Sequence, residues 1–481
     1  MVDAQEHLFV GGRWLPATDG DTYRKTCPWR PDEQTGTYAA ASARDVASAV
    51  EAARDSFRGW ARLPLAERAA YLRAAAREIE ASADEIAQDM TREMGKPIRE
   101  ARGETARAAQ ILHFFAGEAH RATGERFQQA ANGSEVSTAR RALGVVGLIA
   151  PWNFPIAIPV WKLAPALVYG NTVVLKLAYE SPATGLHVAK AFERAGLPPG
   201  VLNVLTGRGS SAGAALVQAP EVRAISFTGS VQTGHGVRDD AVRGGKRVQL
   251  ELGGHNPLIV MDDADLARAV EAAYAGAFWS AGQKCTATRR IYVHRAVYST
   301  FRTALRERIA RGVVGDPFDP ATEVGPLVNE SQFDEVLEAI ERGRAEGGTV
   351  VAGGGRVEAV PGYLVAPTVF ESVADDAFLS CEEVFGPVTS LYSFEDFDDA
   401  LDRANRVPFG LSAGIFTGSL RWATRFREEC DAGLLHVNSQ TAGADVHVPF
   451  GGIKGSAFGP HEQGRAAIEF YTDQITVYVD A

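Results

Sequence analysis

The chain has little cysteine for its length. Its 481 residues include only Cys27, Cys285, Cys381 and Cys430. Four cysteines are too few to form the disulfide framework typical of small secreted proteins. The first residues, MVDAQEHLFVGGRW, do not place a basic segment before an apolar core, so we expect no secretory signal peptide. Both observations favour a reducing, cytoplasmic compartment.

The sequence also lacks an uninterrupted apolar run long enough for a membrane span. A spanning helix needs about 20 largely apolar residues, and the most apolar stretch of the chain is interrupted too often to provide them. We therefore expect this stretch to form a buried strand, a loop, a helix and a second strand. That stretch, residues 142–177, is broken by Pro151, Asn153, Pro155, Pro159, Lys162 and Pro165.

An excess of positive charge is missing as well. Lysine and arginine number 49 against 60 aspartates and glutamates, which gives a net charge of −11. This balance argues against nucleic acid or an anionic membrane as the main partner. Hydrophobic residues make up 46% and charged residues 23%, as in ordinary globular proteins. At roughly 150 residues per domain the length suggests about three units.

The order of apolar segments predicts an α/β fold. Residues 44–120 carry apolar side chains at helical spacing. From Leu143 onward, strands predicted in GVVGLIAP, NTVVLKL, GVLNVLTG and AISFTG alternate with helices predicted at 182–195, 211–218 and 232–239. Such alternation is typical of a parallel sheet. A second alternating block runs from about residue 256 to residue 450.

Two segments lie outside this alternation. Asn132-Gly133, in a polar stretch, suits the tight turn of a hairpin. The C-terminal segment TDQITVYVD predicts one more strand. We expect the hairpin and this strand to form an extension that pairs with another subunit.

Cys285 is a candidate nucleophile. A lone cysteine is most often a small, inert core residue. The neighbours of Cys285 are polar or small, however, and Lys284 supplies a positive charge that favours the thiolate.

Glu251 and Asn153 are candidates to assist such a nucleophile. Glu251 ends an apolar strand in VQLELGGHNP, where burial would raise its pKa and make it a general base. The alternative is a strand-end glutamate that faces solvent. Asn153, in APWNFP, offers an amide for an oxyanion, although by itself it equally suits a turn.

The segment SFTGSVQTG predicts a site for a dinucleotide phosphate. Gly229 and Ser230 lie between a predicted strand and a helix, whose first N–H groups bind phosphate. The spacing departs from G-x-G-x-x-G, so the segment alone is a weak indication. Lys176, at a strand end, can reach a ribose or phosphate. In CEEVFGP, Glu383 can bind a ribose and Phe385 can lie against a nicotinamide; the alternative is a simple turn.

Taken in order, these segments resemble the NAD(P)-dependent aldehyde dehydrogenase superfamily over essentially the whole chain. The motifs are PWNFP, NTVVLK, SFTGS, ELGG followed 34 positions later by Cys285, EEVFGP and PFGGIKGSAFG. The resemblance implies an α/β fold with a Rossmann-like cofactor domain, an α/β catalytic domain and a small β oligomerisation arm in a homodimer or homotetramer. The implied ranges are 1–123 and 143–253 for the cofactor domain, 254–453 for the catalytic domain, and 124–142 and 466–481 for the arm.

The resemblance also implies a mechanism. Cys285 would attack an aldehyde to give a thiohemiacetal, with the oxyanion held by Asn153 and the Cys285 backbone N–H. Hydride transfer to the nicotinamide would leave a thioester, which water activated by Glu251 would hydrolyse. Lys162 would relay the proton. Because CoA-acylating relatives typically lack this base, Glu251 favours release of a free acid.

Further contacts follow from the same resemblance, and no metal is expected. Cofactor contacts are implied at Trp152, Lys176, Tyr179, Gly209, Gly229, Ser230, Glu383 and Phe385, and an aromatic substrate tunnel at Phe154, Trp161, Trp279 and Phe450.

Tyr179 departs from the family pattern. Members that prefer NAD often have a glutamate three residues after the strand-end lysine, where it binds the ribose hydroxyls. Without that carboxylate a 2′-phosphate meets less repulsion, and Lys176 can pair with it. The sequence therefore favours NADP, with NAD as the other candidate.

Narrower similarity points to a substrate. Three segments resemble the branch of the family that oxidises 2,5-dioxopentanoate to 2-oxoglutarate. They are MTREMGKPIREARGE, ARRALGVVGLIAPWNFPIAIPVWKLAPAL and TAGADVHVPFGGIKGSAFGPHEQGRAAIEFYT. Succinic semialdehyde dehydrogenases often carry an arginine six positions before the nucleophile, where this chain has Trp279. An anionic substrate needs a basic anchor, but for Arg289 and Arg290 we favour structural pairing.

Two alternatives stay open at this point. The aromatic tunnel also suits a broad-specificity enzyme for aromatic or aliphatic aldehydes. A catalytically silent binding protein on the same fold is a different class, since a fold does not guarantee a function.

Overall fold

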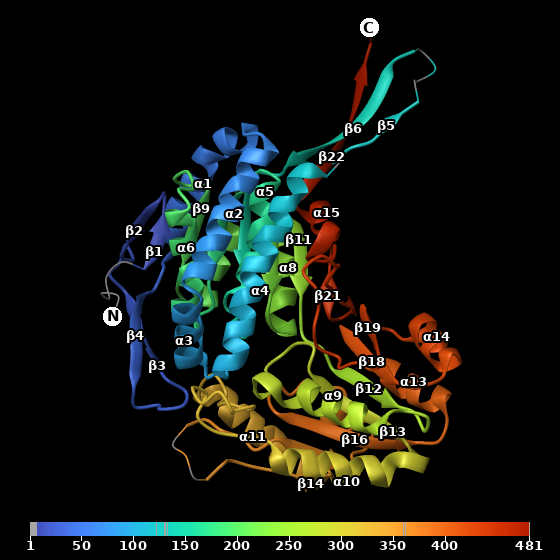
Figure 1. The fold of residues 1–481 in the computed structure, drawn as a ribbon. Coiled ribbons are helices and arrows are strands. Elements are labelled where there is room, and N and C mark those ends of the chain that lie inside the picture. The colour runs from blue at the N-terminus through green and yellow to red at the C-terminus, as the bar shows by residue number, and fades with distance from the viewer. Residues whose placement is uncertain are drawn as a thin grey trace.

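The computed structural model describes residues 7–121, 123–128, 131, 133–358, 360 and 362–480. Within these ranges the chain forms two large sheets, each packed against helices, and a thin arm that projects from the body (Figure 1). Most of the first sheet comes from the blue-to-green part of the chain, with the red strand β21 added, and the second sheet comes from the yellow-green to red part (Figure 1). This arrangement confirms the predicted α/β fold.

The first sheet has the strand order β2-β1-β9-β8-β7-β10-β11-β21. Its central strands, β9 to β11, run parallel, while β1 and β21 add antiparallel edges. The predicted strands in GVVGLIAP, NTVVLKL, GVLNVLTG and AISFTG are confirmed as β7 to β10. The bounds are β1 (Leu8–Val10), β2 (Arg13–Leu15), β7 (Val145–Ile149), β8 (Thr172–Lys176), β9 (Leu202–Leu205), β10 (Val222–Thr228), β11 (Arg247–Glu251) and β21 (Ala457–Phe458).

Helices fill the connections of this sheet. The predicted helices at 182–195 and 232–239 are confirmed as α6 (Pro182–Arg194) and α8 (Val231–Arg243). The third predicted helix, residues 211–218, is only partly an α-helix. Its first turn widens because the Gly213 N–H bonds five residues back to the Arg208 carbonyl, and α7 (Ala214–Gln218) follows.

The long N-terminal helical region is confirmed as four helices. Pro64 precedes α2, Ser82 lies between α2 and α3, and Gly95 and Pro97 lie between α3 and α4; Gly95 adopts a positive φ of 75° where α3 ends. The helices are α1 (Ala43–Arg62), α2 (Leu65–Ala81), α3 (Ala83–Met94) and α4 (Ile98–Gly117).

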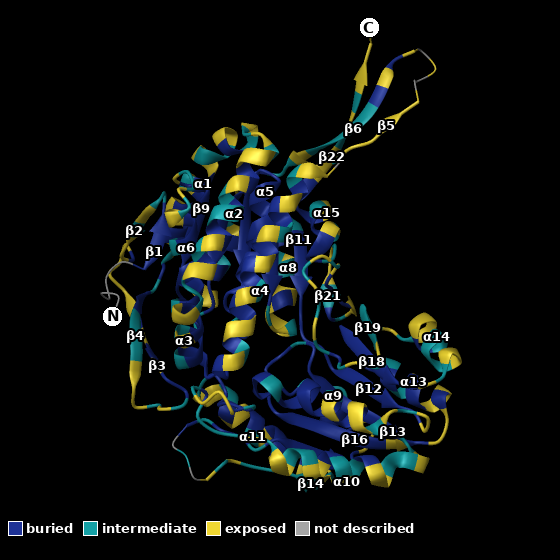
Figure 2. Ribbon diagram, in the orientation of Figure 1, coloured by how far each residue is buried: buried dark blue, intermediate teal, exposed yellow. Residues whose placement is uncertain are grey.

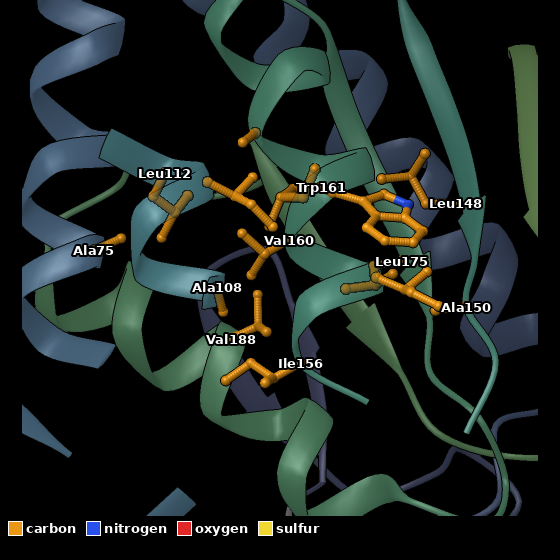
Figure 3. Packing of buried hydrophobic residues seen from close by; sticks show 14 of the residues in the cluster. Ala75, Ala108, Leu112, Leu148, Ala150, Ile156, Val160, Trp161, Leu175 and Val188 are labelled. Atoms are coloured by element: carbon orange, nitrogen blue, oxygen red, sulfur yellow. The ribbon is translucent and has the colours of Figure 1, made fainter. Parts of the chain in front are cut away.

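The apolar stretch 142–177 folds as predicted, into β7, a loop, a helix and β8. The helix is α5 (Ala157–Val168), and every one of its residues is buried. Ala108 and Leu112 of α4 lie on one side of Val160 and Ile156, while Trp161 reaches toward Leu148 of the sheet (Figure 3). No helix among the described residues is long and apolar enough to cross a membrane.

The second sheet has the order β14-β15-β16-β13-β12-β18-β19, and all its neighbours are parallel except β14 with β15. Figure 2 shows its strands as buried as those of the first sheet. The strands are β12 (Asn256–Val260), β13 (Thr288–His294), β14 (Thr349–Ala352), β15 (Thr368–Glu371), β16 (Val388–Phe394), β18 (Ser412–Phe416) and β19 (Leu434–Val437), and the main helices are α9 (Leu266–Phe278), α10 (Arg295–Arg311), α11 (Glu330–Ala345), α13 (Phe397–Asn405) and α14 (Leu420–Glu429).

The arm is a three-stranded antiparallel sheet in the order β22-β6-β5. Its strands are β5 (Arg126–Phe127), β6 (Glu135–Ala142) and β22 (Thr472–Val479), so the predicted C-terminal strand is confirmed. Of the predicted turn, Gly133 has the expected positive φ of 90°, and Asn132 lies outside the described residues. The arm extends away from both sheets (Figure 1).

Candidate active site

Cys285 lies in a tight loop between α9 and β13. Just before it, Ser280, Ala281 and Gly282 all have positive φ, at 57°, 52° and 68°. For residues other than glycine this conformation costs about 1–3 kcal/mol each. Glu100 of α4 offsets part of that cost because its carboxylate accepts the Ser280 N–H at 3.0 Å. The loop is therefore held in shape by a helix from the other half of the chain.

Asn256 fixes the far side of this loop. Its Nδ2 donates to the backbone carbonyls of Cys285 at 2.8 Å and Ala287 at 2.9 Å. Gly254 allows the close approach, because a Cβ there would lie 2.6 Å from the Cys285 carbonyl oxygen. The sequence analysis did not single out Asn256, although it stands directly after the ELGGH segment.

Asn153 is brought to the same loop. It is buried, and its Nδ2 donates to the Gln283 carbonyl at 3.0 Å. Lys96 donates to the Asn153 carbonyl at 2.7 Å and pairs with Glu104 of α4. The amide and the Cys285 side chain line one cavity, so the predicted pair is assembled.

The Cys285 thiol is not activated in this form of the protein. Burial raises its pKa to about 12, helped by the negative charges of Glu383 and Glu251. The charges of Lys284 and a Cys285 thiolate attract each other, as expected, but burial of the thiol outweighs this attraction. Lys284 is itself buried, its Nζ donates to the Ala275 carbonyl at 3.0 Å, and burial lowers its pKa to about 8.

Glu251 ends β11 deep inside the protein. Burial raises its carboxyl pKa well above the usual range, and the charge of Glu462 adds to this rise. Lys162 and the Gly452 N–H oppose it. The solvent-facing alternative for Glu251 is therefore excluded. A Cβ on Gly451 would lie 2.8 Å from Glu251 Oε1, so only glycine leaves the carboxylate this space.

Lys162 belongs to a buried polar network beside Glu251. Its Nζ donates to Ser226 Oγ at 2.8 Å and pairs with Glu462. Ser226 in turn contacts Gln249 Oε1 at 3.1 Å. Sequence reasoning missed Glu462, because its only signal is its place in PHEQG near the C-terminus.

A cavity of about 520 Å³ opens beside Cys285 and is lined by several of the predicted cofactor residues. The Trp152 and Phe385 rings meet edge to face there, with centroids 5.4 Å apart. Glu383 accepts the Gly254 N–H at 3.1 Å, and burial raises its pKa to about 7. Gly229 and Ser230, at the start of α8, line the same cavity.

Lys176 and Tyr179 lie beyond this cavity, at the end of β8. Burial lowers the pKa of Lys176 to about 8. Tyr179 stacks on Tyr23 of β3 (Thr22–Thr26) with centroids 4.2 Å apart, and Arg208 covers the Tyr179 ring at 4.5 Å. Gly209 follows Arg208 directly, at the end of the β9 turn. Arg208 is a further basic residue that sequence reasoning missed.

Three of the four predicted tunnel aromatics, Phe154, Trp161 and Phe450, belong to the same hydrophobic cluster as Cys285, while Trp279 packs against the cluster of the second sheet. Trp161 and Phe450 meet with ring centroids 5.3 Å apart. Phe154 lies under the Lys96 ammonium at 4.1 Å, and Trp279 lies near the Arg99 guanidinium at 5.5 Å. None of the four lines the cavity that holds the cofactor candidates.

Comparison with known proteins identifies the family. The sequence profile described as "Aldehyde dehydrogenase family" matches residues 14–477. The chain belongs to the aldehyde dehydrogenase family. It is an NAD(P)-dependent aldehyde dehydrogenase, and the alternative of a silent binding protein is set aside.

Several relatives of this aldehyde dehydrogenase cover nearly the whole chain. It is 43% identical to the alpha-ketoglutaric semialdehyde dehydrogenase of Bacillus subtilis (98% of this chain, 97% of that protein). It is 44% identical to the alpha-ketoglutarate semialdehyde dehydrogenase of Haloferax volcanii (99% of both). A betaine aldehyde dehydrogenase of Cereibacter sphaeroides is 42% identical (98% of this chain, 96% of that protein).

Solved structures share the same fold. An NADP-dependent enzyme of E. coli matches with a TM-score of 0.96 at 35% identity, covering 99% of this chain and 98% of that one. The NAD⁺ complex of a Bacillus cereus aldehyde dehydrogenase also matches with a TM-score of 0.96 at 35% identity, covering 99% and 96%.

Proposed function

We propose that this aldehyde dehydrogenase oxidises 2,5-dioxopentanoate to 2-oxoglutarate. The observation that carries the chemistry is the meeting of a thiol, an amide and a buried carboxylate. Cys285 and Asn153 line one cavity, and Glu251 lies close enough for its charge to act on the Cys285 thiol. The observation that favours this substrate is identity of 43–44% along nearly the whole length of two alpha-ketoglutarate semialdehyde dehydrogenases.

Each residue then has one part in the reaction. The Cys285 sulfur adds to the aldehyde carbon, and the oxygen gains the Asn153 amide and the Cys285 N–H as donors. The bound nicotinamide cofactor supplies a hydride acceptor. Glu251 takes a proton from water as that water attacks the thioester carbon and Cys285 leaves as thiolate. The positive charge of Lys162 favours the carboxylate form of Glu251, and Ser226 and Glu462 hold the Lys162 ammonium in place.

A substrate panel tests this proposal. We expect reduced cofactor, followed at 340 nm, to form with a much higher kcat/KM from 2,5-dioxopentanoate than from succinic semialdehyde, benzaldehyde, hexanal or betaine aldehyde. Comparable values across the panel would favour the second candidate, a broad-specificity enzyme. The 42% identity to a betaine aldehyde dehydrogenase supports this second candidate.

We infer that NADP is the preferred cofactor, with NAD as the alternative. Support comes from the end of β8, where Tyr179 stands in place of a carboxylate. Lys176 and Arg208 both lie near it, the latter with Nη2 3.3 Å from the Tyr179 hydroxyl. Two cations without an acidic side chain at position 179 suit a 2′-phosphate.

In a Tyr179→Glu variant we expect the NADP-to-NAD ratio of kcat/KM to fall by about 10- to 100-fold, the scale of one charged contact. The new carboxylate would repel a 2′-phosphate and accept the ribose hydroxyls of NAD. Tyr179→Phe is the matched control, because it keeps the ring stacked on Tyr23 and should leave the ratio nearly unchanged. An equal ratio in all three proteins would contradict the cofactor assignment.

We also propose that the arm joins subunits into a dimer or a tetramer. In support, β22 is an edge strand of eight residues, and Tyr478, Val479 and Phe127 of the arm are 65%, 54% and 48% exposed. Exposed edges of this kind pair readily with another chain. Sedimentation of the intact enzyme and of a chain ending at Thr472 would test this role.

The domain ranges remain as proposed from sequence: a cofactor domain of 1–123 and 143–253, a catalytic domain of 254–453, and an arm. Supporting them, every strand of the first sheet except β21 lies in the proposed cofactor domain, and every strand of the second sheet lies in the proposed catalytic domain. We further infer a cytoplasmic location, which the four free cysteines favour.

A further inference from the structure

Most basic side chains around the active site are already committed to other groups. Arg289 donates to the carbonyls of Gly386 and Gly282, and Arg290 to those of His255 and Ala404. Both arginines are almost completely buried. The predicted structural pairing of these two residues is therefore confirmed, and neither is free to anchor a substrate.

The two lysines nearest the reacting groups are also paired. Lys96 forms a buried ion pair with Glu104, and Lys162 forms one with Glu462. Breaking such a pair to bind a ligand would leave a buried carboxylate alone, which is costly. A carboxylate on the substrate must therefore find its cation elsewhere.

Arg107 of α4 is different. One of its five N–H donors is used, by a long hydrogen bond of 3.3 Å from Nη2 to Gln463 Oε1. Among the described residues it forms no ion pair, although it is half-buried. Burial lowers its pKa, while the charges of Asp445 and Glu104 oppose the shift. An incompletely solvated guanidinium of this kind has unused capacity for an anion.

Arg107 lies on α4, the helix that packs against α5, and α5 begins four residues after Asn153. Glu104 lies one turn before Arg107 on the same face of α4, and its carboxylate accepts the N–H groups of Ile156 and Ala157. The neighbouring residue Ala108 also points at α5 (Figure 3). This side of α4 thus packs over the segment that carries Asn153.

The other neighbour of Arg107 leads to the aromatic pair. Gln463 follows Glu462, whose backbone bonds in both directions with Phe450 at 2.7 Å. Phe450 in turn packs against Trp161 of α5. Arg107 is therefore linked, through Gln463 and Glu462, to the rim of the wall that Trp161 and Phe450 form. The partly buried residues Ala444 and Val446 pack against the same core cluster as Cys285.

We propose that Arg107 binds the carboxylate at the far end of the substrate and so selects aldehydes that carry a terminal acid. The proposal rests on the proposed function, since it names what holds the charged end of that substrate. The aldehyde end would reach Cys285 while the carboxylate stays at the rim, where the guanidinium offers two parallel N–H donors. A neutral aldehyde gains nothing from this contact.

The test compares Arg107→Met with wild type on 2,5-dioxopentanoate, glutaric semialdehyde and pentanal. Methionine keeps the packing of the arginine stem and removes the charge. We expect KM for both acids to rise by about 10- to 100-fold, with kcat/KM for pentanal changed by less than about 3-fold. Arg102→Met is the control, because Arg102 is exposed on the same helix and pairs with Asp84.

Equal losses on the acids and on pentanal would overturn the proposal and indicate a structural role for Arg107. No loss on either would overturn it as well. If the wild-type enzyme does not prefer 2,5-dioxopentanoate, the proposed substrate is wrong. The comparison of glutaric semialdehyde with pentanal still tests the role of Arg107 in that case. If Arg107→Met does not fold, Arg107→Lys replaces it in the test, because lysine keeps a positive charge. We expect KM for the two acids to rise by less than in the methionine variant, with kcat/KM for pentanal unchanged. A similar loss on the acids and on pentanal would count against the proposal.

Discussion

A Cys285→Ala variant should show no measurable aldehyde oxidation, a loss of at least about 10⁴-fold, and should still bind cofactor. Without the sulfur no thiohemiacetal forms, and nothing else in the cavity replaces it as a nucleophile. The change removes one atom from the wall and leaves Glu383, Phe385 and Ser230 in place. Activity is followed at 340 nm, and cofactor binding by calorimetry.

Cys430→Ala is the matched control. Its thiol is also largely buried, and burial likewise raises its pKa to about 12, but it lies outside the cavity. We expect its activity to stay within about 2-fold of wild type, as for most substitutions away from a site. Retained oxidation in Cys285→Ala would refute the nucleophile assignment.

The raised pKa of Cys285 gives the same residue a pH signature. In the cofactor-free enzyme the thiol is protonated near neutral pH, and only the thiolate reacts with iodoacetamide. Because the pKa is raised to about 12, alkylation of Cys285 should accelerate about tenfold for each pH unit between 7 and 10. A plateau below pH 9 would show that cofactor-free Cys285 is already activated.

In a Glu251→Gln variant we expect a fast first turnover followed by a rate lowered by about 10²- to 10⁴-fold. Acylation does not need the carboxylate, so one equivalent of reduced cofactor should form per active site. Hydrolysis of the thioester does need it, so the acyl-enzyme should accumulate and appear by intact-mass spectrometry. Hydrolysis at the wild-type rate would exclude Glu251 as the base.

The environment of Glu251 sets the acid limb of the pH–rate profile for thioester hydrolysis, the pH range in which the rate falls as the carboxylate becomes protonated. Its pKa is raised, so the active carboxylate is lost as pH falls through that raised value, at higher pH than for an ordinary glutamate. Glu462→Gln removes one cause of the rise and leaves Lys162 without its partner. Both changes favour the charged form of Glu251, so the acid limb should move to lower pH. A merely structural defect would lower the rate without moving the limb.

The residues that carry chemistry were accessible from sequence because each stands in a short motif. Cys285, Glu251 and Asn153 all occur in such motifs, and the structure gathers them around one site. Their supporting residues were not accessible. Glu462 and Asn256 act through contacts with residues far away in the chain, which no local pattern encodes.

The hydrogen-bond partner of Lys284 was not accessible from sequence either. Proximity in sequence to Cys285 predicted a favourable charge, but the direction of a side chain depends on the backbone around it. The turn formed by Ser280, Ala281 and Gly282 directs the lysine back to the carbonyl of Ala275 in α9. Strands and helices, by contrast, followed from periodicity, because burial of one face is a repeated requirement along the whole element.

The strand β21 has a consequence for how the protein is made. It pairs with β11 through Ala457 and Phe458, so the sheet begun by β1 is completed only after the entire second sheet has been synthesised. Glu462 joins Lys162 across a still longer gap of 300 residues. Contacts this distant in sequence form late and slowly. A nascent chain on the ribosome should therefore stay without a finished active site until nearly all of it has emerged, and fragments split between the two sheets should be inactive when expressed singly.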